Sequence, residues 1–357
     1  MKQIRAVVID DSAFMRKSIS IMLESDESIK VIGTAWDGEE GYKLVRSLNP
    51  DIVTLDIEMP KMDGLTALKQ IMKDCPTSVI MISSLTTEGA EATLKAMELG
   101  AVDFIPKELS YVNVNIIKIK EDLVRRVKEI VKQRYFQERI KRLNKIQGNI
   151  PEAQVKYSAE NYLPANKYKA IALGISTGGP MTLQRILPEI SSSINCPVFI
   201  VQHMPPKFTK SLADRLDSIC KLNIKEAEDR ETIDNNTVYI APGGYHMTVK
   251  KTANGSNIID ISDKPTDAIH KPSVDVLLNS VAENYGKNTI GIIMTGMGKD
   301  GLLGIQEIKN RGGYCIAQNE ESCVVYGMPK AVVDAGLADI ISPSEKIPAI
   351  INKAFVI

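Results

Sequence analysis

The sequence has no apolar stretch of about 18 residues, the length that a membrane-spanning helix needs. We therefore expect no direct insertion into a membrane. The first residues, Met1 to Arg5, lead straight into strand-like sequence and lack the apolar core of a signal peptide, so we expect a cytoplasmic protein. Basic and acidic residues are equal in number, 44 of each. This balance gives no overall charge that would attract nucleic acid.

Cysteine and histidine are also scarce. The five cysteines include no Cys-x-x-Cys pair, and free buried thiols are their simplest interpretation. The three histidines are His203, His246 and His270, so any catalytic histidine must be one of these. A chain of 357 residues is long enough for about two domains, each with its own core.

The first part of the chain alternates short apolar runs with segments in which apolar residues recur at helical spacing. Strands alternating with helices predict a parallel, doubly wound sheet. In such a sheet, ligands bind outside the carboxyl ends of the strands. The predicted strands are residues 4–9, 31–33, 51–55, 79–82 and 102–105.

Polar side chains follow four of these predicted strands: Asp10, Asp11, Asp56, Ser83 and Lys107. Three crowded carboxylates favour a hard divalent cation such as Mg²⁺. A hydroxyl and an ammonium group beside them suit a phosphoryl group. Each residue alone could be an ordinary helix cap or a solvated charge. Their positions at successive strand ends favour a shared pocket.

Residues 1 to about 125 resemble a response-regulator receiver domain, which has a flavodoxin-like fold. The motifs that carry the resemblance are residues 8–12, 55–64 and 100–107. One departure is Glu108, where the family usually has proline.

The resemblance also implies roles for individual residues. It implies that Asp56 accepts phosphate from a chemotaxis histidine kinase. It implies that Mg²⁺ is held by Asp10, Asp11, Asp56 and the backbone carbonyl of Glu58. Finally, it implies that Ser83 and Lys107 contact the phosphoryl oxygens.

The connection begins with an amphipathic helix predicted from residue 116 to about residue 134. Basic residues continue beyond it, and a solvated helix face explains them better than a nucleic-acid site, because Tyr135 and Phe136 are the only aromatic residues there. Residues 148–167 have no periodicity and predict a flexible linker. We therefore expect a receiver domain at 1–134, a linker at 135–167 and a second domain at 168–357.

The second domain opens with a buried strand, a glycine-rich turn and a helix start over residues 170–180. Residues 174–178 match the nucleophile-elbow pattern, which lifts the Ser176 hydroxyl off the end of a strand. The alternative is a plain βα turn, or one that holds a phosphate group. Further apolar runs at 197–201, 237–240, 288–294 and 314–317 predict a second doubly wound α/β domain, and Asn254-Gly255 predicts a β-hairpin within it.

Three strand ends of this domain carry Ser176, His203 and Asp300. A serine nucleophile needs a base, a histidine can supply it, and an aspartate can fix the imidazole tautomer. The rival base is His270. With Asp260, Asp263 or Asp267 it would give the order serine, aspartate, histidine along the chain, which is the order of the catalytic residues in α/β-hydrolases. We rank His246, on the predicted hairpin, lower as a proton acceptor.

Residues from about 168 to 357 resemble the catalytic domain of the CheB-type chemotaxis methylesterases, a Rossmann-like fold. The matching motifs are residues 176–179, 202–206, 241–243, 270–277, 295–301 and 318–329. The resemblance implies a triad of Ser176, His203 and Asp300, with oxyanion donors at Met297 and near Thr177. One departure is Ile175, where the family often has alanine.

The expected function is a phosphorylation-gated serine hydrolase that removes methyl esters from glutamates on the cytoplasmic helices of chemoreceptors and deamidates receptor glutamines. We expect the unphosphorylated receiver to cover the catalytic face. The esterase chemistry itself needs no cofactor in this interpretation. The alternatives are a receiver-regulated phosphate- or nucleotide-binding module without catalysis, and a receiver-linked transcription factor.

Overall fold

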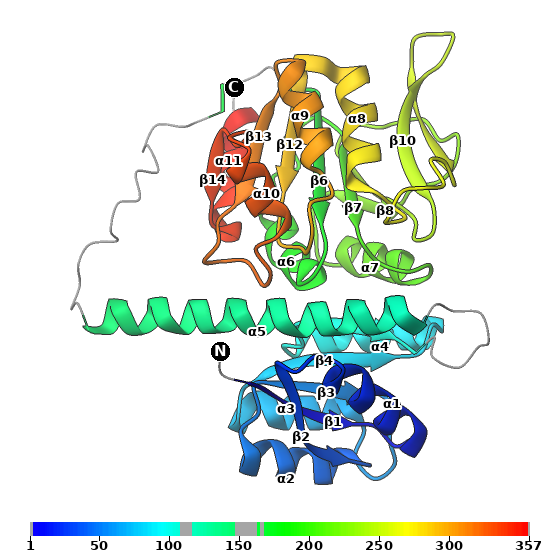
Figure 1. Ribbon diagram of the computed structural model, residues 1–357. Helices are drawn as coiled ribbons and strands as arrows, with labels where there is room; N and C mark the ends of the chain where they lie inside the picture. The colour runs from blue at the N-terminus through cyan, green and yellow to red at the C-terminus, as the bar shows by residue number, and fades with distance from the viewer. Residues whose placement is uncertain (1–2, 108–115, 147–162, 165–167, 356–357) are drawn as a thin grey trace. The chain divides into compact units, whose positions relative to one another are not determined.

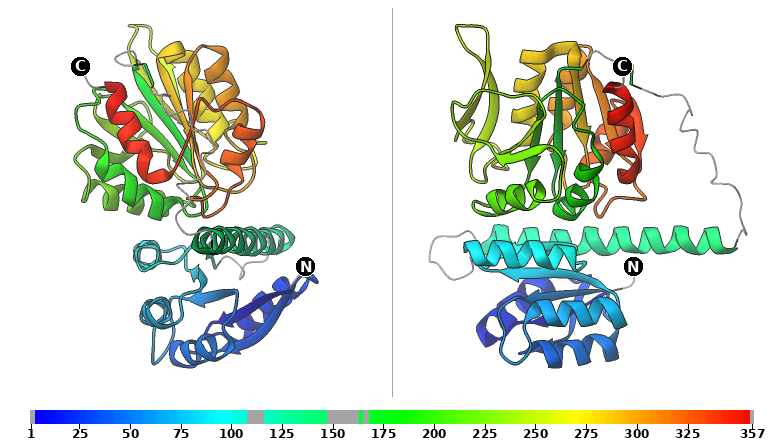
Figure 2. Two further views of the ribbon diagram at one scale, coloured as in Figure 1. Left: turned by 90° about the vertical axis from the view of Figure 1, so that its left-hand side faces the viewer. Right: turned by 180° about the vertical axis from the view of Figure 1, so that it is seen from behind.

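The computed structural model describes residues 3–107, 116–146, 163–164 and 168–355 (Figure 1). The chain divides into two compact units, Met1–Glu138 and Arg139–Ile357. Each unit is built on a parallel sheet with helices on both faces, which confirms the predicted fold class (Figure 2). Among the described helices, none combines the length and the apolar character that crossing a membrane requires.

The first unit contains a five-stranded parallel sheet in the order β2-β1-β3-β4-β5. Its elements are β1 (Ile4–Ile9), α1 (Ala13–Glu24), β2 (Ile29–Ala35), α2 (Gly38–Leu48), β3 (Ile52–Asp56), α3 (Gly64–Asp74), β4 (Ser78–Ser83), α4 (Thr87–Glu98) and β5 (Asp103–Pro106). The strand order reverses between β1 and β3, and the carboxyl ends beside such a reversal form a binding crevice.

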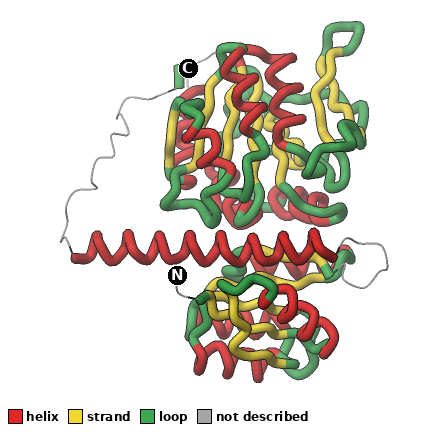
Figure 3. Tube along the Cα trace, viewed as in Figure 1, coloured by secondary structure: helices red, strands yellow, loops and turns green. Residues whose placement is uncertain are grey.

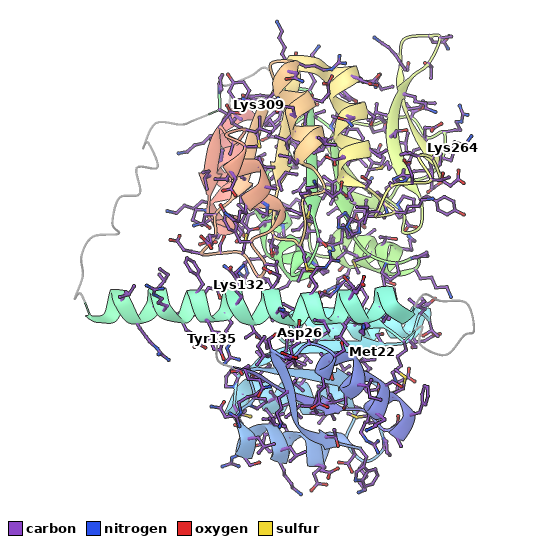
Figure 4. All side chains as sticks on the ribbon, in the orientation of Figure 1. Met22, Asp26, Lys132, Tyr135, Lys264 and Lys309 are labelled. Carbon is purple, nitrogen blue, oxygen red and sulfur yellow. The ribbon has the colours of Figure 1, made fainter. Side chains whose placement is uncertain are left out.

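Helix α5 (Ile116–Ile146) continues well past the end that the apolar pattern predicts. Polar contacts tie it to the first unit, among them two that involve the labelled residues Asp26 and Tyr135 (Figure 4). The Lys128 ammonium donates to Asp26 at 2.8 Å, and the Tyr135 hydroxyl donates to Asp51 at 2.6 Å. The later turns are rich in Lys, Arg, Glu and Gln, which are good helix formers, so the helix extends where the apolar pattern has already ended.

The second unit contains a seven-stranded parallel sheet, in the order β14-β13-β12-β6-β7-β9-β8, and the predicted antiparallel hairpin (Figure 3). Its strands are β6 (Ala170–Ile175), β7 (Val198–Gln202), β8 (Asn223–Glu226), β9 (Thr237–Ile240), β10 (His246–Lys251), β11 (Asn257–Ser262), β12 (Thr289–Ile293), β13 (Tyr314–Gln318) and β14 (Ile340–Ser342).

The helices of the second unit form a layer on each face of its sheet (Figure 2). They are α6 (Gly179–Ile186), α7 (Phe208–Asp217), α8 (Val274–Tyr285), α9 (Leu302–Asn310), α10 (Met328–Asp334) and α11 (Ile347–Phe355). The hairpin packs beside α8, where the Val249 N–H donates to the Ser280 hydroxyl at 3.1 Å and the Asn284 amide donates to the Val249 carbonyl at 2.9 Å. These contacts fix α8, whose first turn reaches the candidate active site.

Candidate active site

Strand β6 lies in the middle of the seven-stranded sheet, between β7 and β12. Its last residue, Ile175, pairs with Gln202 on β7, so the residues that follow, Ser176 and His203, emerge side by side. The His203 N–H donates to the Ile175 carbonyl at 3.2 Å, and this bond keeps the segments that follow β6 and β7 side by side beyond the sheet. Strand β12 leads into the loop that carries Asp300. The topology thus brings the three predicted residues to one edge of the sheet.

The turn after Ser176 depends on glycine. Gly178 has a φ of 75°, in the left-handed region that favours glycine, and begins α6. A Cβ atom at Gly296 would lie 2.8 Å from the Cβ of Ser176, which shows how closely the turn at residues 296–298 passes the serine. Two oxyanion donor positions were predicted, and the first of them, Met297, lies in this turn. Thr177, which marks the second, is buried, and its carbonyl accepts from the Thr295 hydroxyl at 2.9 Å.

His203 is held by Asp300. Its Nε2 lies 2.8 Å from Oδ2 of the aspartate, and both side chains are only 10% exposed. Burial alone would raise the pKa of Asp300, but the bond and charge of His203 and nearby backbone N–H groups hold this pKa well below its usual range. The ionised carboxylate of Asp300 accepts a hydrogen bond from the Nε2–H of His203, which leaves Nδ1 as the ring nitrogen that can take a proton.

The other two histidines have different surroundings. The ring of His270 stacks on that of His203, with 4.3 Å between centroids. Asp260, one of its suggested partners, instead pairs with Lys250 across the hairpin at 2.8 Å. His246 is fully buried, and its Nδ1 accepts from the Ser273 N–H at 3.2 Å. Burial lowers the pKa of His246, so this residue is suited to a neutral, structural role.

Two buried polar residues join the loops of the site and were missed from the sequence. The Gln202 amide donates to the carbonyls of Ser176, at 3.0 Å, and His203, at 3.3 Å. The Thr295 hydroxyl accepts from the N–H groups of Val324 and Val325 as well as donating to Thr177. Each is a polar residue directly after an apolar run, and this position is the feature of the sequence that could have identified them as part of the site.

Ile175, the departure from the family pattern, is fully buried. It is the last residue of β6, and its Cγ1 lies 3.1 Å from where a Cβ atom of Gly179 would be. The larger side chain therefore sits in the core under the turn.

The acidic residues of the first unit also come together. Ligand atoms of Asp10, Asp11 and Asp56 all lie within 4.8 Å of one another. Asp10 Oδ2 is buried and has no hydrogen-bond partner among the residues that the structure describes. A buried, unsatisfied carboxylate oxygen beside two other carboxylates fits a divalent cation. Burial raises the pKa of Asp56 to about 6, although the bond from Lys107 acts against this shift.

The predicted phosphoryl contacts lie around the same pocket. The Lys107 ammonium is 2.6 Å from Oδ2 of Asp56. The Glu58 N–H donates to Oδ1 of Asp56 at 3.3 Å. Ser83 is fully buried; its hydroxyl donates to the Gly89 carbonyl at 3.1 Å and accepts from Thr93 at 2.7 Å. It would have to leave these α4 partners to reach a phosphoryl group. Glu108 lies outside the described residues.

An acidic pocket on a doubly wound sheet, together with a second sheet whose edge gathers serine, histidine and aspartate, is the arrangement expected of a response regulator joined to a hydrolase domain. Comparisons with known proteins agree with this class. The family described as "response regulator receiver domain" matches residues 6–115, and that described as "CheB methylesterase" matches residues 171–351. The chain belongs to the CheB methylesterase family and carries a receiver domain.

Individual relatives match over nearly the whole chain. A Nitratidesulfovibrio vulgaris protein named "Protein-glutamate methylesterase/protein-glutamine glutaminase 2" is 47% identical, over 98% of this chain and 99% of its own. A Pyrococcus abyssi protein named as a protein-glutamate methylesterase/protein-glutamine glutaminase is 44% identical, over 99% and 94%. The crystal structure of the Thermotoga maritima CheB methylesterase catalytic domain is 45% identical, with a TM-score of 0.50, and covers 52% of this chain and 98% of its own.

Proposed function

We propose that this chain is a phosphorylation-activated serine hydrolase that removes methyl esters from glutamate side chains on the cytoplasmic helices of chemoreceptors, and that it deamidates glutamines there. It would thereby act in chemotactic adaptation, in the cytoplasm. The names of its relatives support the substrate. The observation that carries the mechanism is the His203–Asp300 pair beside Ser176. The test is methanol release by the full-length protein from methylated receptor.

In the proposed reaction, the Ser176 hydroxyl attacks the ester carbonyl while Nδ1 of His203 takes its proton. Asp300 holds the other ring nitrogen and stabilises the imidazolium. Backbone N–H groups at Met297 and near Thr177 stabilise the oxyanion. The C–O bond to the methoxy group then breaks, and His203 returns the proton so that methanol leaves. Water hydrolyses the acyl-serine by the same proton transfers in the opposite order. With glutamine, ammonia leaves instead.

In the proposed regulation, Asp56 accepts a phosphoryl group from a chemotaxis histidine kinase. Asp10, Asp11, Asp56 and the Glu58 carbonyl would hold Mg²⁺, which when bound neutralises phosphoryl charge. Lys107 is already within ion-pair distance of Asp56, so it can follow the new negative charge. Ser83 would exchange its α4 partners for a phosphoryl oxygen. This exchange offers a route from the pocket to α4, because Gly89 and Thr93 both belong to that helix.

Magnesium binding should weaken as the pH falls through about 6, the pKa of Asp56 in the metal-free pocket. A proton competes with the metal for the carboxylate, so roughly tenfold weaker binding is expected at pH 5 than at pH 7.5. The single tryptophan, Trp36, follows Ala35, whose carbonyl accepts from the Asp10 N–H at 3.1 Å. Its fluorescence should report a magnesium titration at each pH. Equal dissociation constants at the two pH values would contradict this assignment.

A small acyl phosphate with Mg²⁺ should raise the initial rate of methanol release, and Asp56→Asn should not respond. A 100-fold activation needs only about 2.7 kcal/mol of differential stabilisation between two states. The matched control is Asp74→Asn, which changes an exposed aspartate bonded to the Tyr42 hydroxyl. This control should activate normally. Unchanged rates, once mass spectrometry has confirmed that Asp56 is phosphorylated, would remove phosphorylation gating from the proposal.

A further inference from the structure

The first turns of α8 and α9 are capped by each other's aspartates. The carboxylate of Asp300, just before α9, accepts from the N–H groups of Val274, at 2.8 Å, and Asp275, at 2.9 Å. In return, Oδ1 of Asp275 accepts from the N–H groups of Gly301, at 2.9 Å, and Gly304, at 2.8 Å. The N–H groups at the start of a helix have no partner within the helix. Asp300 satisfies two of them at the start of α8, and Asp275 satisfies the N–H groups of the N-cap residue and of one first-turn residue at the start of α9.

Helix α9 needs a cap from outside because its N-cap residue is Gly301, which has no side chain to supply one. Glycine is required at this position. Its φ is 100°, and a Cβ atom would lie 2.6 Å from Cδ1 of Ile293 and 2.8 Å from Cγ1 of Val274. Asp275 therefore takes the place of an N-cap side chain, and it accepts a hydrogen bond from Gly301, the residue next to Asp300.

From this geometry, we propose that Asp275 is a positioning residue for the reaction: it holds Asp300 in the orientation that meets His203. The inference rests on the proposed role of Asp300 in catalysis. The network joins three segments, because Asp300 Oδ2 binds His203 and Val274 while Oδ1 binds Asp275 and the Ser273 hydroxyl, the latter at 3.0 Å. If Gly301 shifts, Asp300 moves with it.

The alternative role for Asp275 is simple stabilisation of α9. Two observations favour positioning. The carboxylates of Asp275 and Asp300 are close enough that the charge of Asp300 adds to burial in raising the pKa of Asp275, an unfavourable pairing for stability alone. In addition, Asp275 bonds the residue next to Asp300, where a shift of about 1 Å can cost roughly 100-fold in rate.

The test compares Asp275→Ala with Asp275→Asn in the full-length protein, with methylated receptor as substrate. Alanine removes the acceptor for Gly301 and Gly304, so kcat should fall about 10- to 100-fold with little change in KM. Asparagine keeps an acceptor oxygen and should recover most of the lost kcat. The downfield proton resonance of the His203–Asp300 hydrogen bond should vanish in Asp275→Ala and remain in Asp275→Asn. Asp275→Ser, too short to reach both N–H groups, should behave like alanine and provides a second variant.

The matched control is Asp339→Ala. Asp339 is also half-buried and accepts a backbone bond, from the Cys315 N–H at 2.7 Å, but it lies at the opposite end of the sheet and pairs with Lys309, labelled in Figure 4. It should lower the melting temperature without lowering kcat. Normal kcat in Asp275→Ala, equal losses of kcat in both alanine variants, or an Asp275→Asn protein as slow as alanine would each overturn the proposal. Ser176→Ala in the same assay tests the proposed function separately.

Discussion

Replacing Ser176 with alanine should lower the rate of methanol release by at least about 10⁴-fold, because no other group would form the acyl-enzyme. Folding should be unaffected. The side chain lies at the surface end of β6, while the backbone bonds that hold the turn, from Ser176 N–H to the Thr295 carbonyl at 2.9 Å and from Gly179 N–H to the Ser176 carbonyl at 2.7 Å, do not involve the hydroxyl. Initial rates and melting temperature should be measured on the same preparation.

The matched control for this variant is Ser192→Ala, which removes an exposed hydroxyl elsewhere in the same unit. It should retain the wild-type rate. Methanol release by Ser176→Ala at a rate close to wild type would show that the nucleophile has been wrongly assigned, and it would favour a non-catalytic role for the glycine-rich turn.

The two stacked histidines should differ strongly when each is changed to glutamine. His203→Gln should lower kcat by about 10⁴-fold, since it removes the group that accepts the serine proton and pairs with Asp300. His270→Gln should cost much less, about tenfold, because it removes the ring that stacks on that base but leaves the base and its bond to Asp300 in place. Single-turnover rates with methylated receptor would separate effects on the chemical step from effects on binding.

The reverse ranking would reject the assignment of His203. If His270→Gln were the more damaging change to kcat, the base would be His270, and the chain order of α/β-hydrolases would apply. Both variants introduce the same neutral side chain, so each serves as the control for the other.

Much of the fold could be predicted because it depends on local patterns. The central strands are apolar on both faces, as parallel strands buried between two helix layers must be, and they were visible as continuous apolar runs. Two edge strands, β8 and β14, were not predicted. β8 has one apolar residue among Asn223 to Glu226, and β14 is three residues long. Such short edge strands are defined by pairing with a neighbouring strand, and the sequence of the segment itself does not reveal this pairing.

In the candidate site, too, local patterns predicted some features, while others depend on contacts between distant parts of the sequence. Ser176, His203 and Asp300 could be proposed because each directly follows an apolar run or lies in a glycine-rich loop after one. The supporting contacts could not, because they join backbone groups distant in the sequence: Gln202 reaches the Ser176 carbonyl, and Asp275 caps a helix 26 residues further on. The pairing of β6 with β7 decides the first of these bonds, the packing of α8 beside α9 decides the second, and local sequence patterns record neither.

The most direct test of the central claim is covalent trapping of the nucleophile. The full-length protein should be treated with an acylating or phosphonylating serine reagent, and the modified peptide identified by mass spectrometry while methanol release is followed. We predict one label per chain on Ser176, loss of activity in proportion to labelling, and greatly slowed labelling of His203→Gln. A protein that keeps releasing methanol with Ser176 fully labelled, or that loses activity through a label elsewhere, would contradict the account.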